Sequence, residues 1–490
     1  MPVVTRKMSR GALVMVLLAI YACFEFPAYL VGNMKYLGMF GLSIALMLTI
    51  AILCFEDFFR RIAEYHDIHR DLVGKRLLLA LVLVLASVSH LNKVLMAHHM
   101  YIQARILSLP VNRVTLGVYA AFALTTLAML IRPPRSLTPI VALAFAWGFV
   151  IRVLAITMVP VTYDAADMLF AVNGACQDLL RGVNPYSQTY YASPSDSFPL
   201  IYFPLLWLPY LPFRAVGIDI RWLNLLAQAG LLIFFWSFIG RSSRQRYLAL
   251  IFCLLALLPD AIFSVFFRQL SLYWLLGAVA LWLVYRERWN WSALAIASLA
   301  AMRLTAFTVL WIYLIYIWKR RGMRTAVAHL LVAAGLLAGS LLPFAGVGAA
   351  RLKYVFFGRF IELAASSGWQ QSLYALSVGG ILQWLRLGSL QLPLQALGVF
   401  VVGVLYARCG DHSFASFART SAFAYAWFLW VSGFIAIYYW FFVLIIFCTL
   451  CFIEADAGIG SNTPEGTPLS APVQKSSGVS ALGDQCTSYS

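Results

Sequence analysis

The chain has 490 residues, of which 62% are hydrophobic and only 11% are charged. Soluble globular chains carry about 45–50% apolar and about 25% charged residues, so this composition excludes a soluble globular protein, a disordered protein and a coiled coil. The net charge is +17, from 36 Lys and Arg against 19 Asp and Glu. We attribute this excess to short loops that orient membrane helices. Nucleic-acid binding is disfavoured, because no basic run outside the apolar segments is interleaved with aromatic residues.

Apolar runs of the length that crosses a bilayer, about 20 residues, recur along the chain. The clearest are 11–31, 37–55, 77–97, 114–131, 138–160, 222–240, 246–266, 270–285, 325–345 and 437–453. Weaker or interrupted runs are 199–213, 291–318, 372–406 and 420–435. Lipid offers the backbone no hydrogen-bond partners, and these runs are too long for barrel strands. We therefore expect an all-α, polytopic membrane protein with about 11 to 14 transmembrane helices.

Basic clusters between the runs predict which connections face the cytoplasm. The clusters are Arg6, Lys7 and Arg10; Arg60 to Arg76; Arg132 and Arg135; and Arg241, Arg244 and Arg246. This assignment puts the loop 161–200 outside, provided that 199–213 does not cross the membrane. The run 199–213 contains four prolines, which disfavour a regular spanning helix. We expect it to lie in the outer interface.

The run 291–318 is flanked by basic residues on both sides, Arg286 and Arg288 before it and Lys319 to Arg324 after it. It is too short for two full crossings. Either it is one long span, which would put one of the two basic clusters on the outer side, or two short helices meet near Arg303. An arginine within the membrane is costly and indicates function, although a structural role for Arg303 remains open.

The polar loop 161–200 holds the first candidate catalytic residues. Its first half has helical spacing and ends at Gly182, before a turn at Asn-Pro-Tyr. Asp164 and Asp167 are three residues apart and share a helical face. They are charges at a helix start, parts of a solvated loop, or a pair in which one carboxylate acts as a general base.

From this loop onward, residues 160–445 resemble the polyprenyl-phosphate-sugar-dependent glycosyltransferases of the GT-C class, family 87, which includes mannosyltransferases. The elements that carry the resemblance are Asp164 or Asp167, then Gly182-Val183-Asn184-Pro185-Tyr186, Tyr202-Phe203-Pro204-Leu205, Arg268-Gln269-Leu270-Ser271, Arg303-Leu304-Thr305, Gln370-Gln371-Ser372-Leu373 and Tyr438-Tyr439-Trp440. The chain departs from the family pattern at Phe203, Arg268, Arg303, Tyr438 and Tyr439, where the family has Pro, Gly, Lys and His. These departures affect the identity of the sugar more than the class of reaction.

The resemblance implies a GT-C-like fold and an inverting transfer of a mannose, or of another hexose or pentose, to a lipid or cell-envelope glycan. Asp167 or Asp164 would be the base, and Arg303 and Arg268 would bind the lipid phosphate, with Arg152 a weaker candidate. The remaining donor- and substrate-binding candidates are Asp260, Asn184, Tyr186, Tyr202, Gln371, Tyr438 and Tyr439. Asp260 is equally well interpreted as the partner of an arginine. The aromatic candidates are equally well interpreted as an interfacial belt.

The domain organisation predicted from these features has three parts: N-terminal transmembrane helices over 1–135, a catalytic core over 136–453, and a disordered cytoplasmic tail over 454–490. We expect the plasma membrane as the location and an active site on the outer face. The sequence indicates no cofactor and no metal ligands, and it leaves a requirement for a divalent metal open. The main alternative is a transporter or flippase of a lipid-linked or anionic substrate, with Arg152, Asp260 and Arg303 along its path. A third interpretation is a non-catalytic component of a cell-envelope assembly.

Overall fold

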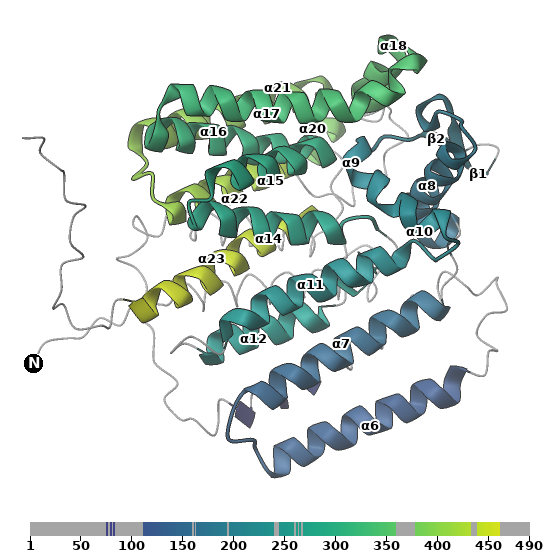
Figure 1. Cartoon of the computed structure of the whole chain (residues 1–490), viewed down its shortest axis with the longest axis vertical. Helices are drawn as coiled ribbons and strands as arrows, with labels where there is room; N and C mark the ends of the chain where they lie inside the picture. Colours follow the sequence, from purple (N-terminus) through teal and green to yellow (C-terminus); the bar gives the residue numbers. More distant parts are fainter. Residues whose placement is uncertain are drawn as a thin grey trace, which may run out of the picture.

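A computed structural model describes residues 111–158, 161, 163–193, 196–239, 245–258, 261–262, 264–265, 268–358, 378–432 and 439–460, with short helical pieces at 75–76, 79–80 and 82–83. Helices dominate this part of the chain, as expected (Figure 1). The predicted runs 11–31 and 37–55 and most of 77–97 lie outside the described residues.

The first half of the described chain contains the loop between two long helices. Its elements are α6 (Val111–Ile131), α7 (Thr138–Met158), α8 (Tyr163–Leu180), η2 (Pro185–Ser187), β1 (Thr189–Ser193), β2 (Asp196–Pro199), α9 (Pro204–Trp207), η3 (Leu208–Tyr210), α10 (Leu211–Ala215), α11 (Arg221–Ile239) and α12 (Gln245–Leu257). The proline-rich run 199–213 is broken into short helical pieces, as its prolines predict.

The second half consists mainly of packed antiparallel helices. Its elements are α14 (Ser271–Tyr285), α15 (Trp289–Met302), η4 (Leu304–Ala306), α16 (Phe307–Arg321), α17 (Met323–Leu341), η5 (Leu342–Val347), α18 (Ala349–Lys353), η6 (Tyr354–Gly358), α20 (Val378–Trp384), η8 (Gly388–Leu390), α21 (Gln391–Cys409), α22 (Phe414–Val431) and α23 (Phe441–Gly460). The predicted run 372–406 is interrupted, since α20 and α21 are separate helices.

Three helical stretches in the described residues are long and apolar enough to cross a membrane: Arg221–Ile239, Met323–Val347 and Gly388–Cys409. Shorter apolar helices accompany them at Ala120–Ile131, Thr138–Leu154, Leu248–Leu257, Ser271–Tyr285 and Phe441–Ala455. Together they indicate membrane association of a predominantly helical protein.

Two details differ from the sequence-based expectation. The outer loop contains a small antiparallel hairpin of β1 and β2, in which Tyr190 pairs with Phe198, so the described chain is not purely helical. Helix α23 continues to Gly460, although the disordered tail was expected to begin at residue 454. Residues 461–490 lie outside the described part.

The helices run back and forth between two ends of the molecule. One end, here called the loop end, carries α8, β1, β2, α9 and α10, which gather on the right of Figure 1. The other, the basic end, carries the turns 286–288, 319–324 and 410–412. At the basic end, Arg320 and Arg321 make ion pairs of 3.5 and 3.6 Å with Glu287. The turns 286–288 and 319–324 therefore lie on the same side of the molecule, as one of the two alternatives for 291–318 requires.

Candidate functional site

Arg303 lies at a break between two helices. Helix α15 ends at Met302, Arg303 has an extended backbone (φ −147°, ψ 138°), and α16 starts at Phe307 after one 3-10 turn. The ion pairs of Glu287 hold the far ends of α15 and α16 together, so the two helices form a hairpin with Arg303 at its tip. Of the two alternatives for 291–318, two short helices is the one that the structure contains.

Tyrosines surround Arg303. Its guanidinium lies 4.4 Å from the ring centre of Tyr439, a cation–π contact between the α15–α16 break and the start of α23. Thr305 donates a hydrogen bond of 3.2 Å to the hydroxyl of buried Tyr425 on α22. Tyr273 of α14 packs against the same ring, Phe442, as Tyr425 does. We call Arg303, Thr305, Tyr273, Tyr425 and Tyr439 the Arg303 cluster.

The Arg303 cluster lies at the loop end. The short helix α9, which begins at Pro204 of the Tyr202–Leu205 element, packs against both α15 and α17. A guanidinium among phenol hydroxyls can bind a phosphate through charge-assisted hydrogen bonds, and tyrosine rings offer flat apolar surfaces beside it. The cluster joins two of the sequence-predicted elements, Arg303-Leu304-Thr305 and Tyr438-Tyr439-Trp440, which are far apart along the chain.

Asp164 and Asp167 lie in the first half of α8, which begins at Tyr163, so the predicted helix exists and carries both residues. The side chains of Asp164 and Asp167 lie outside the described part. The helix ends as Gly182 predicts. Gly182 has φ +76°, and the N–H of Val183 donates to the carbonyl of Asp178, 2.9 Å away, which closes the helix in a Schellman-type turn.

Asn184 and Tyr186 tie the loop to its neighbours. The Asn184 side chain accepts a hydrogen bond from the Tyr186 N–H and donates one of 3.1 Å to the carbonyl of Phe344. Tyr186 is completely buried, and its hydroxyl donates to the Tyr202 carbonyl at 2.6 Å and accepts from Nε1 of Trp207 at 3.1 Å. Burial raises the pKa of Tyr186 well above its ordinary value. The polar groups of Asn184 and Tyr186 are hydrogen-bonded to other groups of the protein, and these bonds hold the loop against α9 and η5.

Arg268 and Gln269 precede α14. Arg268 donates 3.3 Å to the hydroxyl of Ser264, and its carbonyl accepts from the Asn224 amide at 2.7 Å. Gln269 is 1% exposed, yet among the described residues neither polar atom of its amide has a hydrogen-bond partner. A buried amide without partners is costly and marks a place where a ligand can supply them. The sequence signal was the position of Gln269 in the Arg268–Ser271 element, but we had not singled it out as a binding residue.

Arg152 belongs to a buried polar network. Its Nε donates to Oε1 of Gln228 at 2.6 Å, and its Nη1 donates to the carbonyls of Gly148 and Ala256. Gln228 in turn donates to Ala261 and Ser271. The guanidinium is 2% exposed and joins α7, α11 and α12. This arrangement fits a structural role for Arg152 better than phosphate binding.

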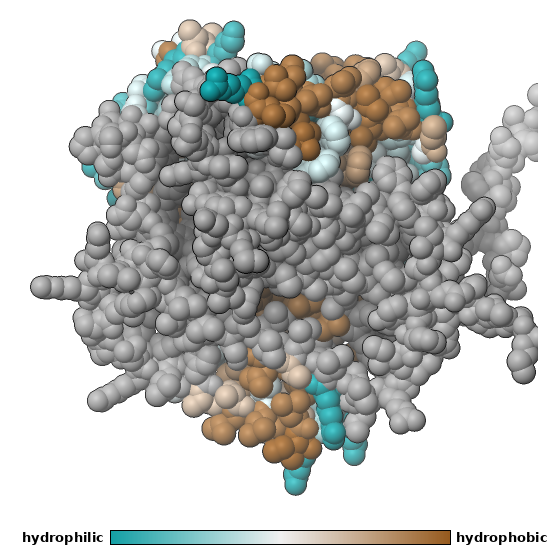
Figure 2. Space-filling view, turned by 180° about the vertical axis from the view of Figure 1, so that it is seen from behind, coloured by the Kyte–Doolittle hydropathy of each residue, from teal (hydrophilic) through white to brown (hydrophobic). Residues whose placement is uncertain are grey.

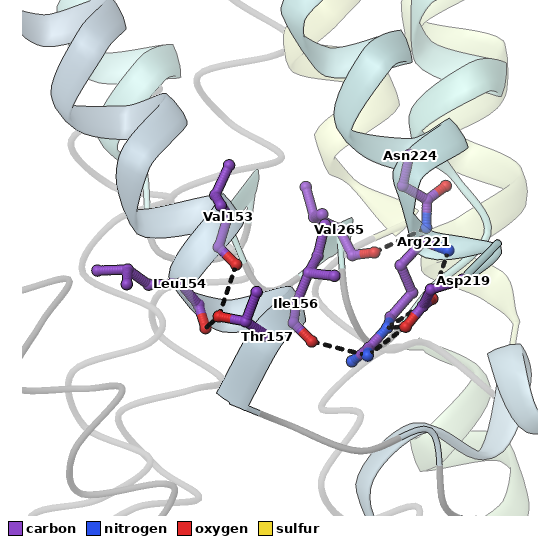
Figure 3. Close-up of polar contacts among 8 residues, drawn as sticks. All are labelled: Val153, Leu154, Ile156, Thr157, Asp219, Arg221, Asn224 and Val265. Carbon is purple, nitrogen blue, oxygen red and sulfur yellow. Dashed lines mark hydrogen bonds and ion pairs between the residues drawn. The ribbon is translucent and has the colours of Figure 1, made fainter. Parts of the chain in front are cut away.

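The start of α11 is anchored in the same way (Figure 3). Arg221 makes a 2.6 Å ion pair with Asp219 and donates to the carbonyl of Ile156 at the end of α7. One turn further on, Asn224 donates to the carbonyl of Val265 and accepts from the Tyr210 hydroxyl. Arg221, Asn224 and Gln228 share one face of α11, which brings α7, η3 and the segment before α14 together.

Three predicted site residues, Asp260, Gln371 and Tyr438, lie outside the described residues. Within the described part, no group of three or more His, Cys, Asp or Glu side chains is arranged to hold a metal ion. Comparisons with protein-family models, curated proteins and solved structures found no match to this chain. The class that the fold defines is therefore a predominantly helical protein with apolar helices of membrane-spanning length.

Proposed function

We propose that this protein is an integral membrane glycosyltransferase of the GT-C type. It would transfer a sugar from a polyprenyl phosphate to a lipid or glycan acceptor at the outer face of the plasma membrane. The observation that carries the proposal is the Arg303 cluster, in which a guanidinium at a helix break faces Tyr439. The cluster lies at the same end of the helices as the loop with Asp164 and Asp167.

The proposed reaction is an inverting displacement at the anomeric carbon. The acceptor oxygen forms a bond to that carbon while the bond from the carbon to the lipid phosphate breaks, and the electron pair leaves with the phosphate. Asp167 or Asp164 takes the proton of the acceptor hydroxyl. Arg303 stabilises the charge on the leaving phosphate, with Arg268 as the second cation. Gln269 has a buried amide available for a sugar hydroxyl.

The location of these groups matches the physical state of the donor. A polyprenyl-phosphate sugar keeps its chain in the bilayer and its phosphate at the headgroup level. The Arg303 cluster lies at the loop end, at the break between the helices α15 and α16, and α9 packs against α15 there. A soluble nucleotide-sugar enzyme would instead need a βαβ domain, and no loop of the sequence is long enough for one.

The test is a transfer assay with radiolabelled polyprenyl-phosphate sugars and membranes that contain the full chain. Wild type should move label to a lipid or glycan, and Asp164→Asn or Asp167→Asn should abolish transfer. The matched control is Asp178→Asn on the same helix, because Asp178 is committed to a hydrogen bond from Tyr190. Asp178→Asn should retain transfer at the wild-type rate.

Two outcomes would contradict the proposal. Full activity in Asp164→Asn, Asp167→Asn and the double variant would exclude both aspartates as the base. Movement of the unaltered lipid-linked sugar across the bilayer, without a new glycosidic bond, would identify a flippase instead.

A further inference from the structure

The basic end carries a strong positive charge that the proposed reaction does not use. Its turns and the last turn of α21 contain seven basic residues and two acidic ones. The basic residues are Arg286, Arg288, Lys319, Arg320, Arg321, Arg324 and Arg408, and the acidic ones are Glu287 and Asp411. Glu287 is shared between Arg320 and Arg321. An excess of this size attracts anionic groups.

Unpartnered polar atoms lie beside these cations. Within the described residues, the hydroxyl of Tyr406, Nδ1 of His412 and Nε1 of Trp289 are buried and have no hydrogen-bond partner. Tyr406 is only 4% exposed, and its ring lies edge-on to His412 at 5.2 Å. A buried hydroxyl without a partner destabilises the fold, so a ligand that supplies an acceptor oxygen would recover that free energy.

Ring contacts and electrostatic effects connect these atoms to the cations. The guanidinium of Arg321 lies 4.9 Å from the ring of Trp289, and that of Arg320 lies 5.8 Å from the ring of Tyr316. The ammonium of Lys319 lies 4.6 Å from the ring of Trp318. Burial lowers the pKa of His412, and the charge of Lys319 lowers it further. The result is one cluster with cations and hydrogen-bond donors.

An apolar strip leads along the helices to this cluster. Trp311 of α16 and Phe400 of α21 stack at 6.3 Å, and both are exposed. Closer to the basic end, Trp318 and Leu405 are exposed as well. We call these four residues the α16–α21 seam. Gly403 makes the close approach possible, because a Cβ at this position would collide with the indole of Trp311.

The surface view agrees with this arrangement. In Figure 2, brown apolar surface covers the top of the molecule, where Figure 1 places α17 and α21, and teal hydrophilic residues lie at its edges. An apolar strip that ends in cations and unpartnered donors matches a molecule with hydrocarbon chains and an anionic head.

We propose that the basic end binds an anionic phospholipid. Its phosphate would lie against Lys319, Tyr406 and His412, and its acyl chains would lie along the α16–α21 seam. This site is at the opposite end of α16 from Arg303, so it is separate from the proposed glycosyl-transfer site. A free phosphate would satisfy the same donors but would make no use of the seam.

The test uses the purified full chain in detergent with an equimolar mixture of phosphatidylglycerol and phosphatidylcholine, followed by repurification and native mass spectrometry. Wild type should retain phosphatidylglycerol in preference to phosphatidylcholine. Tyr406→Phe and Lys319→Gln should each lower that preference about tenfold, the effect of one charge-assisted hydrogen bond. The control is Arg181→Gln, an exposed arginine just after α8 at the loop end, far from the seam. It should keep the preference.

Tyr406→Phe also separates binding from folding. Because the hydroxyl has no partner, the phenylalanine variant should unfold at the wild-type temperature or higher in lipid-free detergent. It should lose the additional stabilisation that phosphatidylglycerol gives to wild type. Equal retention of the two lipids by wild type would overturn the proposal, as would an unchanged preference in both variants. Displacement of phosphatidylglycerol by millimolar inorganic phosphate would show that the site recognises free phosphate rather than a lipid.

Discussion

The Nε atom of Arg152 donates a 2.6 Å hydrogen bond to Oε1 of Gln228, and both side chains are buried. The bond joins α7 to α11, two helices that flank the loop with Asp164 and Asp167. The guanidinium also donates hydrogen bonds to the carbonyls of Gly148 and Ala256. Arg152, a weaker candidate for phosphate binding in the sequence, is therefore bonded to neutral acceptors of the protein. The network fixes the scaffold from which the loop extends.

Replacing the centre of this network should destabilise the protein. Gln228→Met keeps the volume but leaves Arg152, Ala261 and Ser271 without their partner. We expect a loss of about 2 kcal/mol of unfolding free energy, the cost of buried polar groups left unsatisfied. Thermal unfolding in detergent measures it, with Gln188→Met as the control because the Gln188 amide bonds the exposed hydroxyl of Ser187. Equal midpoints for the two variants would contradict the assignment.

Gly148 provides a steric test of the same contact. A Cβ at Gly148 would lie 2.5 Å from the carbonyl oxygen of Ala256 and 2.9 Å from Nη1 of Arg152. Gly148→Ala should therefore separate α7 from α12 and cost about 1–3 kcal/mol, as overpacking does. Gly117→Ala in α6 is the matched change, because nothing lies within 4 Å of its added Cβ. Since alanine favours helix more than glycine, the Gly117 variant should be neutral or more stable. A Gly148 variant as stable as the Gly117 variant would refute the close packing.

The sequence predicted helices well where apolar length alone decides them. The run 222–240 is α11 (Arg221–Ile239), and 270–285 is α14 (Ser271–Tyr285). Residues that end or interrupt helices were equally informative, since Gly182 follows the end of α8 and the prolines of 199–213 break that run. These features depend on local sequence, which is why a single chain is sufficient to predict them.

Contacts between distant residues were not predictable in the same way. Arg152 and Gln228 are 76 residues apart, and no spacing rule links them. The hairpin of β1 and β2 was missed for a local reason, because Pro194-Ser195, between its strands, is not a favoured two-residue hairpin turn. The sequence indicated Gln269 only as part of the Arg268–Ser271 element. Only the structure shows that its amide is buried and, among the described residues, has no hydrogen-bond partner. Helix α23 passes the predicted end at residue 453, where Glu454 and Ala455, two good helix formers, follow the apolar run.

The Arg303 cluster makes a graded prediction about catalysis. Arg303→Lys keeps the positive charge but loses the planar guanidinium group with its several N–H donors, and Arg303→Gln loses both. We expect transfer to fall by roughly 10²–10³-fold in Arg303→Gln, the effect of removing one group that stabilises charge in the transition state. The lysine variant should be intermediate. Rates are measured with the polyprenyl-phosphate sugar donor, and Arg181→Gln, an exposed arginine just after α8, is the control. Equal rates for wild type and Arg303→Gln would remove Arg303 from the site.

Tyr439 tests whether the cation–π contact positions Arg303. Tyr439→Phe keeps the ring and should retain most of the activity, whereas Tyr439→Leu removes it and should weaken donor binding about fivefold. The weaker binding should appear as a higher Michaelis constant for the donor, because the ring positions the guanidinium and does not take part in the reaction. A loss of activity in Tyr439→Phe equal to that in Tyr439→Leu would indicate that the hydroxyl, rather than the ring face, is the important group.

The carboxyl group of Asp411, at the basic end, should make the stability of the protein depend on pH. Burial raises the pKa of its carboxyl, but hydrogen bonds from the N–H and hydroxyl of Ser413 outweigh burial and hold the pKa below its ordinary value. Ser413 in turn caps α22 by accepting a bond from the Ser416 N–H. Because the folded pKa is the lower one, the stabilisation is present above the unfolded pKa, about 3.9, and is lost as the pH falls through the folded pKa.

The effect should be small, below about 1 kcal/mol, because Asp411 is exposed to solvent. Asp411→Asn should lower the thermal unfolding midpoint at pH 6, and the difference from wild type should shrink as the pH falls below 4. Midpoints measured in detergent between pH 6 and pH 3 test this directly. A difference that stays constant or grows toward pH 3 would mean that the carboxylate is not what Ser413 binds, and that the cap of α22 forms without it.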